Sequence, residues 1–167
     1  MIMNIRPMEL SDIPRKAEIH VFGWRSAYRG IVSDEHLFKN MLVSKDIERF
    51  SKDENLYVIK NSFVYDDGII KAILTIGPCR DEDKPNSFEL WGIYVDPFFQ
   101  RQGVGSQMVE FCEKIAVERG FNEVCIWVLE KNTNARKFYE KLGYNPDGAS
   151  KLIELLSVTE VRYIKQI

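Results

Sequence analysis

Several features that would assign this chain to a class of protein are scarce or missing. No apolar run approaches the ~18–20 residues of a membrane span, and residues 1–6 lack the apolar core of a signal peptide. The formal net charge of −2 gives no reason to expect a nucleic-acid partner. The three cysteines have no CxxC spacing and the two histidines are isolated, so no metal site is expected. These absences predict a cytoplasmic protein with free thiols and with no membrane or nucleic-acid partner.

The two best-known phosphate-binding motifs are also missing. No Gly-Lys-Ser/Thr tripeptide of a Walker-type loop occurs in the chain. A dinucleotide-binding loop would need a small residue where Met108 stands and an acidic residue at the end of the next strand, whereas Glu123 begins that strand. A nucleotide enzyme with a degenerate dinucleotide loop, which would bind NAD or ATP, stays as an alternative.

What the chain does have is a glycine-bearing turn at residues 100–105, Gln-Arg-Gln-Gly-Val-Gly, between an expected strand and an expected helix. The start of a helix presents unpaired backbone N–H groups and the positive end of the helix dipole. Glycines let a bulky anion come close to that backbone. The turn therefore predicts an anion cradle, most often used for phosphate.

The length of 167 residues suits one domain, residues 1–167, with a real core. Apolar spacing and caps predict helices at 12–28, 34–40, 45–52, 103–119 and 133–142. Strands are expected at 3–7, 56–59, 69–76, 88–95, 124–129, 152–156 and 158–164, with a hairpin turn at 66–68. Antiparallel hairpins followed by a strand-helix-strand crossover predict a mixed sheet with helices on both faces. That order is wrong for a doubly wound parallel sheet.

The turn follows a strand that ends Tyr-Val-Asp-Pro at residues 94–97, and a second motif lies further along the chain. It begins at Asn132 and continues through Ala135, Phe138, Tyr139, Gly143 and Tyr144. Both motifs, in this order, resemble the GCN5-related N-acetyltransferase (GNAT) family, and residues 24–31 resemble the first helix of a bacterial subgroup. The resemblance implies a mixed α/β fold with a mostly antiparallel sheet of six or seven strands.

The resemblance also implies acetyl-CoA as the acetyl donor. Backbone groups of Ile93, Tyr94 and Val95 would pair with the pantetheine arm, and one N–H there would polarise the thioester carbonyl. The pyrophosphate would lie on the turn, and Asn132 and Arg136 would also contact the donor. The residues of the turn are Gln100, Arg101, Gln102, Gly103, Val104, Gly105 and Ser106.

Two residues are candidates for the chemistry. Tyr139 would donate to the departing thiolate, although an aromatic residue in this pattern also fits core packing. Glu89 would take the proton of the amine, although it could equally be a solvated strand residue. A branch that acetylates protein N-termini has a Glu where this chain has Trp127, so that branch's mechanism does not transfer directly. No cysteine stands near the motif residues, which argues against an acyl-enzyme.

Aromatic residues that could line an acceptor pocket are Trp24, Tyr28, Trp91 and Trp127, and each alone also fits core packing. We expect direct transfer from acetyl-CoA to a primary amine of a small molecule, peptide or protein. The alternative is a non-catalytic acyl-CoA-binding sensor. Dimers are common in the family, so a homodimer is an open expectation. The acidic residues at 81–83 are expected to be solvated rather than to hold a metal.

Overall fold

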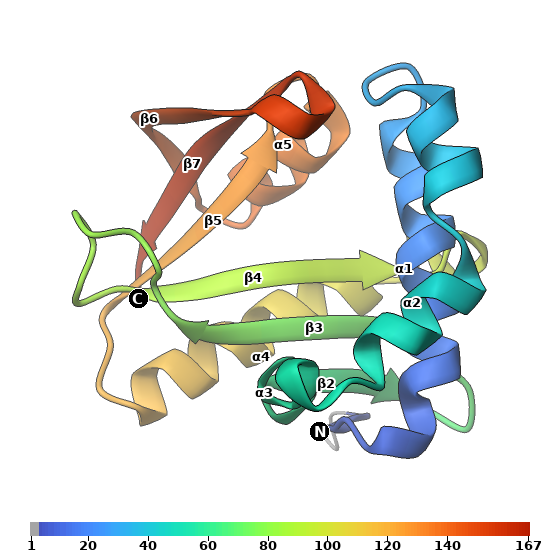
Figure 1. The fold of residues 1–167 in the computed structure, drawn as a ribbon. Helices are drawn as coiled ribbons and strands as arrows, with labels where there is room; N and C mark the ends of the chain where they lie inside the picture. Colours follow the sequence, from blue (N-terminus) through green and yellow to red (C-terminus); the bar gives the residue numbers. More distant parts are fainter. Residues whose placement is uncertain (1–3) are drawn as a thin grey trace.

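Seven strands form one mixed sheet in the computed structural model, which describes residues 4–167 (Figure 1). Their order across the sheet is β1-β2-β3-β4-β5-β7-β6, and neighbours run antiparallel except β4 and β5. The predicted fold class is therefore confirmed. The strands are β1 (Ile5–Pro7), β2 (Ser62–Asp66), β3 (Ile70–Pro78), β4 (Phe88–Val95), β5 (Glu123–Leu129), β6 (Asn145–Ile153) and β7 (Val158–Gln166).

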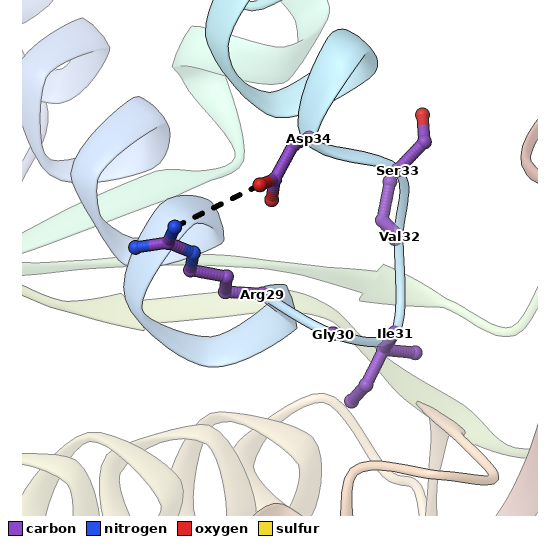
Figure 2. A pocket seen from close by; sticks show the side chains of 6 residues that line it. All are labelled: Arg29, Gly30, Ile31, Val32, Ser33 and Asp34. Carbon is purple, nitrogen blue, oxygen red and sulfur yellow. Dashed lines mark ion pairs between the residues drawn. The ribbon is translucent and has the colours of Figure 1, made fainter.

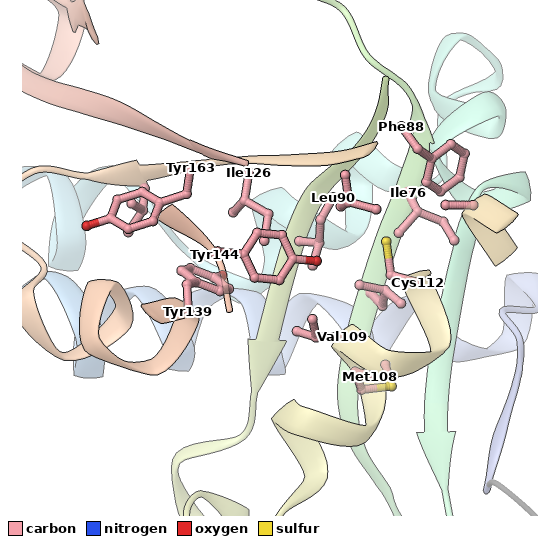
Figure 3. Packing of buried hydrophobic residues seen from close by; sticks show 14 of the residues in the cluster. Ile76, Phe88, Leu90, Met108, Val109, Cys112, Ile126, Tyr139, Tyr144 and Tyr163 are labelled. Atoms are coloured by element: carbon pink, nitrogen blue, oxygen red, sulfur yellow. The ribbon is translucent and has the colours of Figure 1, made fainter. Parts of the chain in front are cut away.

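Helices cover both faces of this sheet because successive strand residues point to opposite sides. On β3, Ile73 packs with α1 (Ile13–Tyr28), α2 (Val43–Phe50) and α3 (Leu56–Lys60). Its neighbours Ala72 and Leu74 pack instead with α4 (Val104–Glu118) and α5 (Thr133–Lys141). Figure 3 shows this second and larger core, in which Met108 and Cys112 of α4 meet the sheet. None of the helices within residues 4–167 has the length and apolar content needed to cross a bilayer.

One expected strand is wrong and another is wrong in part. Residues 56–59 belong to α3, and the following strand is β2. A four-residue apolar run does not distinguish a strand from a helical turn, and here only Ile59 is buried while Tyr57 is exposed. The strand expected at 152–156 ends at Ile153, where a 3₁₀ turn, Glu154–Leu156, connects β6 to β7. Of the first expected strand, residue 3 lies outside the described residues.

Candidate active site

β4 and β5 lie side by side for only three residue pairs and then diverge. Residues 88–90 pair with residues 124–126, after which β4 stays with β3 and β5 stays with β7. Figure 1 shows the carboxyl ends of the two strands pointing in different directions. The edge of β4 that faces β5 therefore has unpaired backbone groups along residues 91–95, and such an edge can pair with an extended ligand.

Two local features explain the divergence. Thr75 pairs with Gly92 and Ile76 pairs with Leu90, which leaves Trp91 as the extra residue of a β-bulge, and a bulge bends its strand. Beyond the strand, the buried Asp96 accepts a hydrogen bond from Arg15 of α1 at 2.5 Å. The end of β4 is thereby attached to α1 rather than to β5.

The divergent ends form a cleft of about 810 Å³. It brings together β4, β5, the glycine turn, α5, the end of α1 and the β6–β7 connection. Most of the residues predicted from the sequence line it: Trp24, Tyr28, Trp91, Ile93, Tyr94, Val95, Gln100, Arg101, Gly103, Gly105, Ser106, Trp127, Asn132 and Tyr139. Four predicted residues are not part of this lining: Glu89, Gln102, Val104 and Arg136.

The glycine turn has the backbone expected of an anion cradle. Arg101 (φ 61°) and Gly103 (φ 81°) both adopt left-handed conformations, and no side chain caps the N-terminus of α4. The first N–H groups of α4 are thus left for a ligand. Gly105 has a different role, since it lets α4 pack closely on α5: a Cβ there would lie in tight contact with the Phe138 ring, at 3.3 Å.

Tyr139 lies on α5 with 7% of its surface exposed, and it lines the cleft. Burial raises the pKa of its phenol above the ordinary value, so the hydroxyl stays protonated at neutral pH. Within residues 4–167 this hydroxyl makes no hydrogen bond, in contrast to that of Tyr144, which donates to Glu113 at 3.0 Å. A protonated hydroxyl without a protein partner is free to donate to a ligand.

The two other α5 candidates differ from each other. Asn132 caps α5, because its Oδ1 accepts from the N–H of Ala135 at 3.2 Å, and it also lines the cleft. Arg136 instead donates to the Tyr163 hydroxyl and to the carbonyl of Glu130. Its guanidinium is already used in holding α5 to β7.

The predicted aromatic residues surround the other end of the cleft. The indole N–H of Trp24 donates to the Tyr94 hydroxyl at 3.0 Å, and the Trp24 and Tyr28 rings pack edge to face. The Trp127 N–H donates to Asp81 at 2.8 Å, and the ammonium of Lys151 lies 3.9 Å from the centre of the Trp127 ring. Trp24 and Trp127 are therefore held in place by polar contacts, and Tyr28 by ring packing, while all three line the cleft.

Glu89 is almost fully buried, and its carboxylate is occupied by Arg80. The Arg80 side chain donates to both carboxylate oxygens and its backbone N–H donates to one of them. As a base, Glu89 would have to give up this ion pair and act from outside the cleft. Glu89 as the base stays a prediction that this geometry disfavours.

Glu89 also belongs to a group of three potential metal ligands with Cys79 and Cys125, whose ligand atoms lie within 4.8 Å of one another. Burial raises the pKa of both thiols, which keeps them protonated, and the carboxylate already faces a guanidinium. A metal ion would have to displace Arg80 and remove two thiol protons.

The carboxylate that does line the cleft is Glu160, which is not among the residues predicted from the sequence. It lies on β7, opposite Leu129 of β5 and Lys151 of β6. Burial raises the pKa of its carboxyl group, and the nearby Lys151 opposes that rise. No local motif marks Glu160, because the register of three strands places it in the cleft.

The acidic loop at 81–83 is not simply solvated, which corrects the expectation. Asp81 and Asp83 both accept hydrogen bonds from the buried Arg162, which also pairs with Asp147. The two aspartates hold the β3–β4 loop against β7. Two carboxylates that were expected to be solvated thus balance the charge of a buried arginine.

A second hollow lies at the turn after α1 (Figure 2) and is lined by residues 29–34 alone. Its ion pair, Arg29 to Asp34 at 3.7 Å, is largely exposed, and the side chains of Ile31 and Ser33 point away in different directions. Because one loop forms it and no groups converge there, the cleft between β4 and β5 is the candidate active site.

Similarity to known proteins identifies the family. A model of the acetyltransferase (GNAT) family matches residues 18–144. The chain belongs to this family. The uncharacterized N-acetyltransferase YuaI of Bacillus subtilis is 31% identical over 87% of this chain and 81% of its own. A probable N-acetyltransferase of Mycobacterium tuberculosis is 25% identical over 97% of this chain and 91% of its own. This chain is thus an enzyme of the acyltransferase class.

Solved structures agree on the fold. The PaiA N-acetyltransferase of Thermoplasma acidophilum, in complex with coenzyme A, has a TM-score of 0.77 at 21% identity and covers 98% of each chain. The protein yncA of Salmonella typhimurium, solved with its cofactor acetyl-CoA, has a TM-score of 0.68 at 15% identity over 97% of this chain and 92% of that one.

Proposed function

We propose that the protein transfers an acetyl group from acetyl-CoA directly to a primary amine, within a ternary complex of the protein, acetyl-CoA and the amine. The observation that carries this proposal is the cleft itself. It joins a free strand edge, an uncapped helix N-terminus and a tyrosine hydroxyl without a protein partner. Relatives solved with coenzyme A or acetyl-CoA share the fold.

These three features fit the chemistry of an acyl-CoA. The free backbone groups of residues 93–95 match the amides of a pantetheine arm. The N–H groups at the start of α4, with Arg101 and Ser106 beside them, match a pyrophosphate. Acetyl-CoA supplies the acetyl group as a thioester.

For the transfer, the chain would provide two groups that act on the developing charges. A free backbone N–H of β4 is suited to donate to the carbonyl oxygen as negative charge collects there. Tyr139 would donate its hydroxyl proton as a hydrogen bond to the sulfur that leaves, since its raised pKa keeps it protonated. The amine must lose its proton before it attacks, because an alkylammonium has a pKa of ~10.

The first experiment is thermal unfolding with saturating acetyl-CoA, coenzyme A, NAD or ATP. A ligand at 100 times its dissociation constant adds about 2.7 kcal/mol, which shifts the midpoint by several degrees. We expect a rise with the two CoA compounds alone. A rise with NAD or ATP instead would support a nucleotide enzyme.

The second experiment separates an enzyme from a binding module. Acetyl-CoA is incubated with primary amines of several classes, and both released coenzyme A and acetylated product are quantified. We expect equal amounts of the two. Binding of CoA without turnover of any amine would make the protein an acyl-CoA sensor and would contradict the proposed function.

A further inference from the structure

Glu160 stands apart from every other acidic side chain of the described residues because it alone lines the cleft. Its charge contributes to raising the pKa of Tyr28, after burial and two neighbouring tyrosines, and also contributes at Tyr94. Glu160 is thus electrostatically coupled to the aromatic end of the cleft. Among the described residues, Arg101 is the one other charged residue of the lining, and it belongs to the glycine turn.

The protein already places an alkylammonium at this carboxylate. Lys151 Nζ lies 3.6 Å from Glu160 Oε2 and 3.9 Å from the centre of the Trp127 ring. A carboxylate on one side and an indole face on the other are the two elements that bind a cationic amine. The Lys151 side chain is 47% exposed, so its ammonium can move aside into solvent.

We propose that Glu160 and the Trp127 ring form the ammonium site of the acceptor, and that Glu160 takes the proton of the amine before transfer. This inference rests on the proposed function. It also assigns an acceptor class, namely a small primary amine with one cationic centre on an apolar or aromatic body.

The class follows from what lines the rest of the acceptor end. Trp24, Tyr28, Ile153 and Leu156 supply aromatic and apolar surface there. No second carboxylate among residues 4–167 lines the cleft, so a second ammonium of a polyamine would lose its water without gaining a partner. A monoamine with an apolar body meets both parts of the site.

The step balances as a simple acyl transfer. One proton of the ammonium passes to the Glu160 carboxylate, and the freed nitrogen lone pair forms the N–C bond. The C–S bond breaks, and coenzyme A leaves as a thiolate that accepts a hydrogen bond from Tyr139. The acylated nitrogen then gives up its second proton, which neutralises the thiolate, so the products are the neutral amide and the coenzyme A thiol. Solvent then removes the proton from Glu160, so no oxidant or further reactant is needed.

The pH profile provides a direct readout of Glu160. Burial raises the pKa of the carboxyl group, so the rate should rise with pH as the carboxylate forms. The charged and titratable groups that act on it come from every side: Lys151 on β6, Arg80 on the β3–β4 loop, Glu89 and Tyr94 on β4, and Tyr28 on α1. Lys151→Met removes the positive charge that lowers the pKa of Glu160. The acidic limb of the profile, where the rate rises with pH, should therefore move to higher pH.

The experiment compares Glu160→Gln with Glu118→Gln, which removes a carboxylate from an exposed pair with Lys114 on α4. Rates are measured with 2-phenylethylamine and with spermidine, and coenzyme A binding is measured by calorimetry. We expect Glu160→Gln to lower kcat/KM for 2-phenylethylamine by ~100-fold and to abolish the acidic limb, with coenzyme A affinity unchanged. Glu118→Gln should match the parent, and 2-phenylethylamine should exceed spermidine at least tenfold.

A second pair of variants tests the ammonium site. Lys151→Met should lower KM for 2-phenylethylamine by about threefold because a competing ammonium is removed, whereas the matched Lys114→Met should not change it. Turnover of amines with an unchanged pH profile in Glu160→Gln, or a preference for spermidine, would overturn this inference and leave the acetyltransferase proposal standing. Failure of every amine despite CoA binding would overturn both.

Discussion

The first half of β4, residues 88–90, has a partner strand on both sides. In the second half the bulged Trp91 has no partner residue, and residues 92–95 pair only with β3. Phe88, Glu89 and Leu90 are buried, while residues 91–95 are all partly accessible and line the cleft. The difference begins at the bulge of Trp91. One half of β4 is thus structural, and the other half has an unpaired edge that is available to a ligand. Substitutions in or beside the two halves should therefore have different consequences.

The largest expected effect on folding belongs to the paired half. Phe88 is fully buried and packs beside Phe121, so Phe88→Ala should lower the free energy of unfolding by about 3–5 kcal/mol. Phe98→Ala removes the same atoms from a side chain that is 88% exposed, so it should change the free energy of unfolding by less than about 0.5 kcal/mol. Urea unfolding measures both. Equal losses of unfolding free energy in the two variants would contradict the structural role given to the paired half of β4.

The largest expected effect on chemistry belongs to the cleft. Tyr139→Phe removes a hydroxyl that has no protein partner in the described residues, so kcat should fall by ~100-fold while stability stays near that of the parent. Tyr144→Phe should do the reverse, because its hydroxyl donates to Glu113 outside the cleft, and the variant should lose about 1 kcal/mol of stability with kcat unchanged. Full turnover by Tyr139→Phe would exclude its role at the leaving group.

A smaller effect, on coenzyme A affinity, is expected to distinguish a substitution at the start of α4 from one after its end. Gly103 and Gly120 have nearly the same left-handed backbone (φ 81° and 84°), and neither has an atom closer than 3.9 Å to an added Cβ. Alanine at either position should cost about 1 kcal/mol of stability. Gly103→Asp should also weaken coenzyme A binding by at least about tenfold, because a carboxylate would compete for the anion site. Calorimetric titration of both aspartate variants measures this, and equal affinities would remove the turn from the donor site.

The sequence predicted most of this cleft because its donor side depends on local signals. A glycine-bearing turn before an amphipathic helix and an Asn cap before a second helix are both readable from neighbouring residues. The resemblance to a known family then connected the two. Most of the predicted donor residues do line the same cleft.

The acceptor side could not be predicted in this way. Glu160 reaches the cleft through the pairing of β5, β7 and β6, and Glu89 is directed to Arg80 by a loop contact nine residues away in sequence. Both positions depend on tertiary register, which periodicity does not report. The short helix α3 was missed for a related reason, since only its packing distinguishes it from a strand.

The central claim is that the unpaired half of β4 and the start of α4 bind the acetyl donor. Amide hydrogen exchange with and without saturating coenzyme A tests it most directly. We predict slower exchange at residues 91–95 and 104–106 when coenzyme A is bound. Residues 88–90, already paired on both sides, should gain no local protection beyond that of the globally stabilised core. Protection that is absent from residues 91–95, or that is no greater there than across the rest of the sheet, would contradict the account.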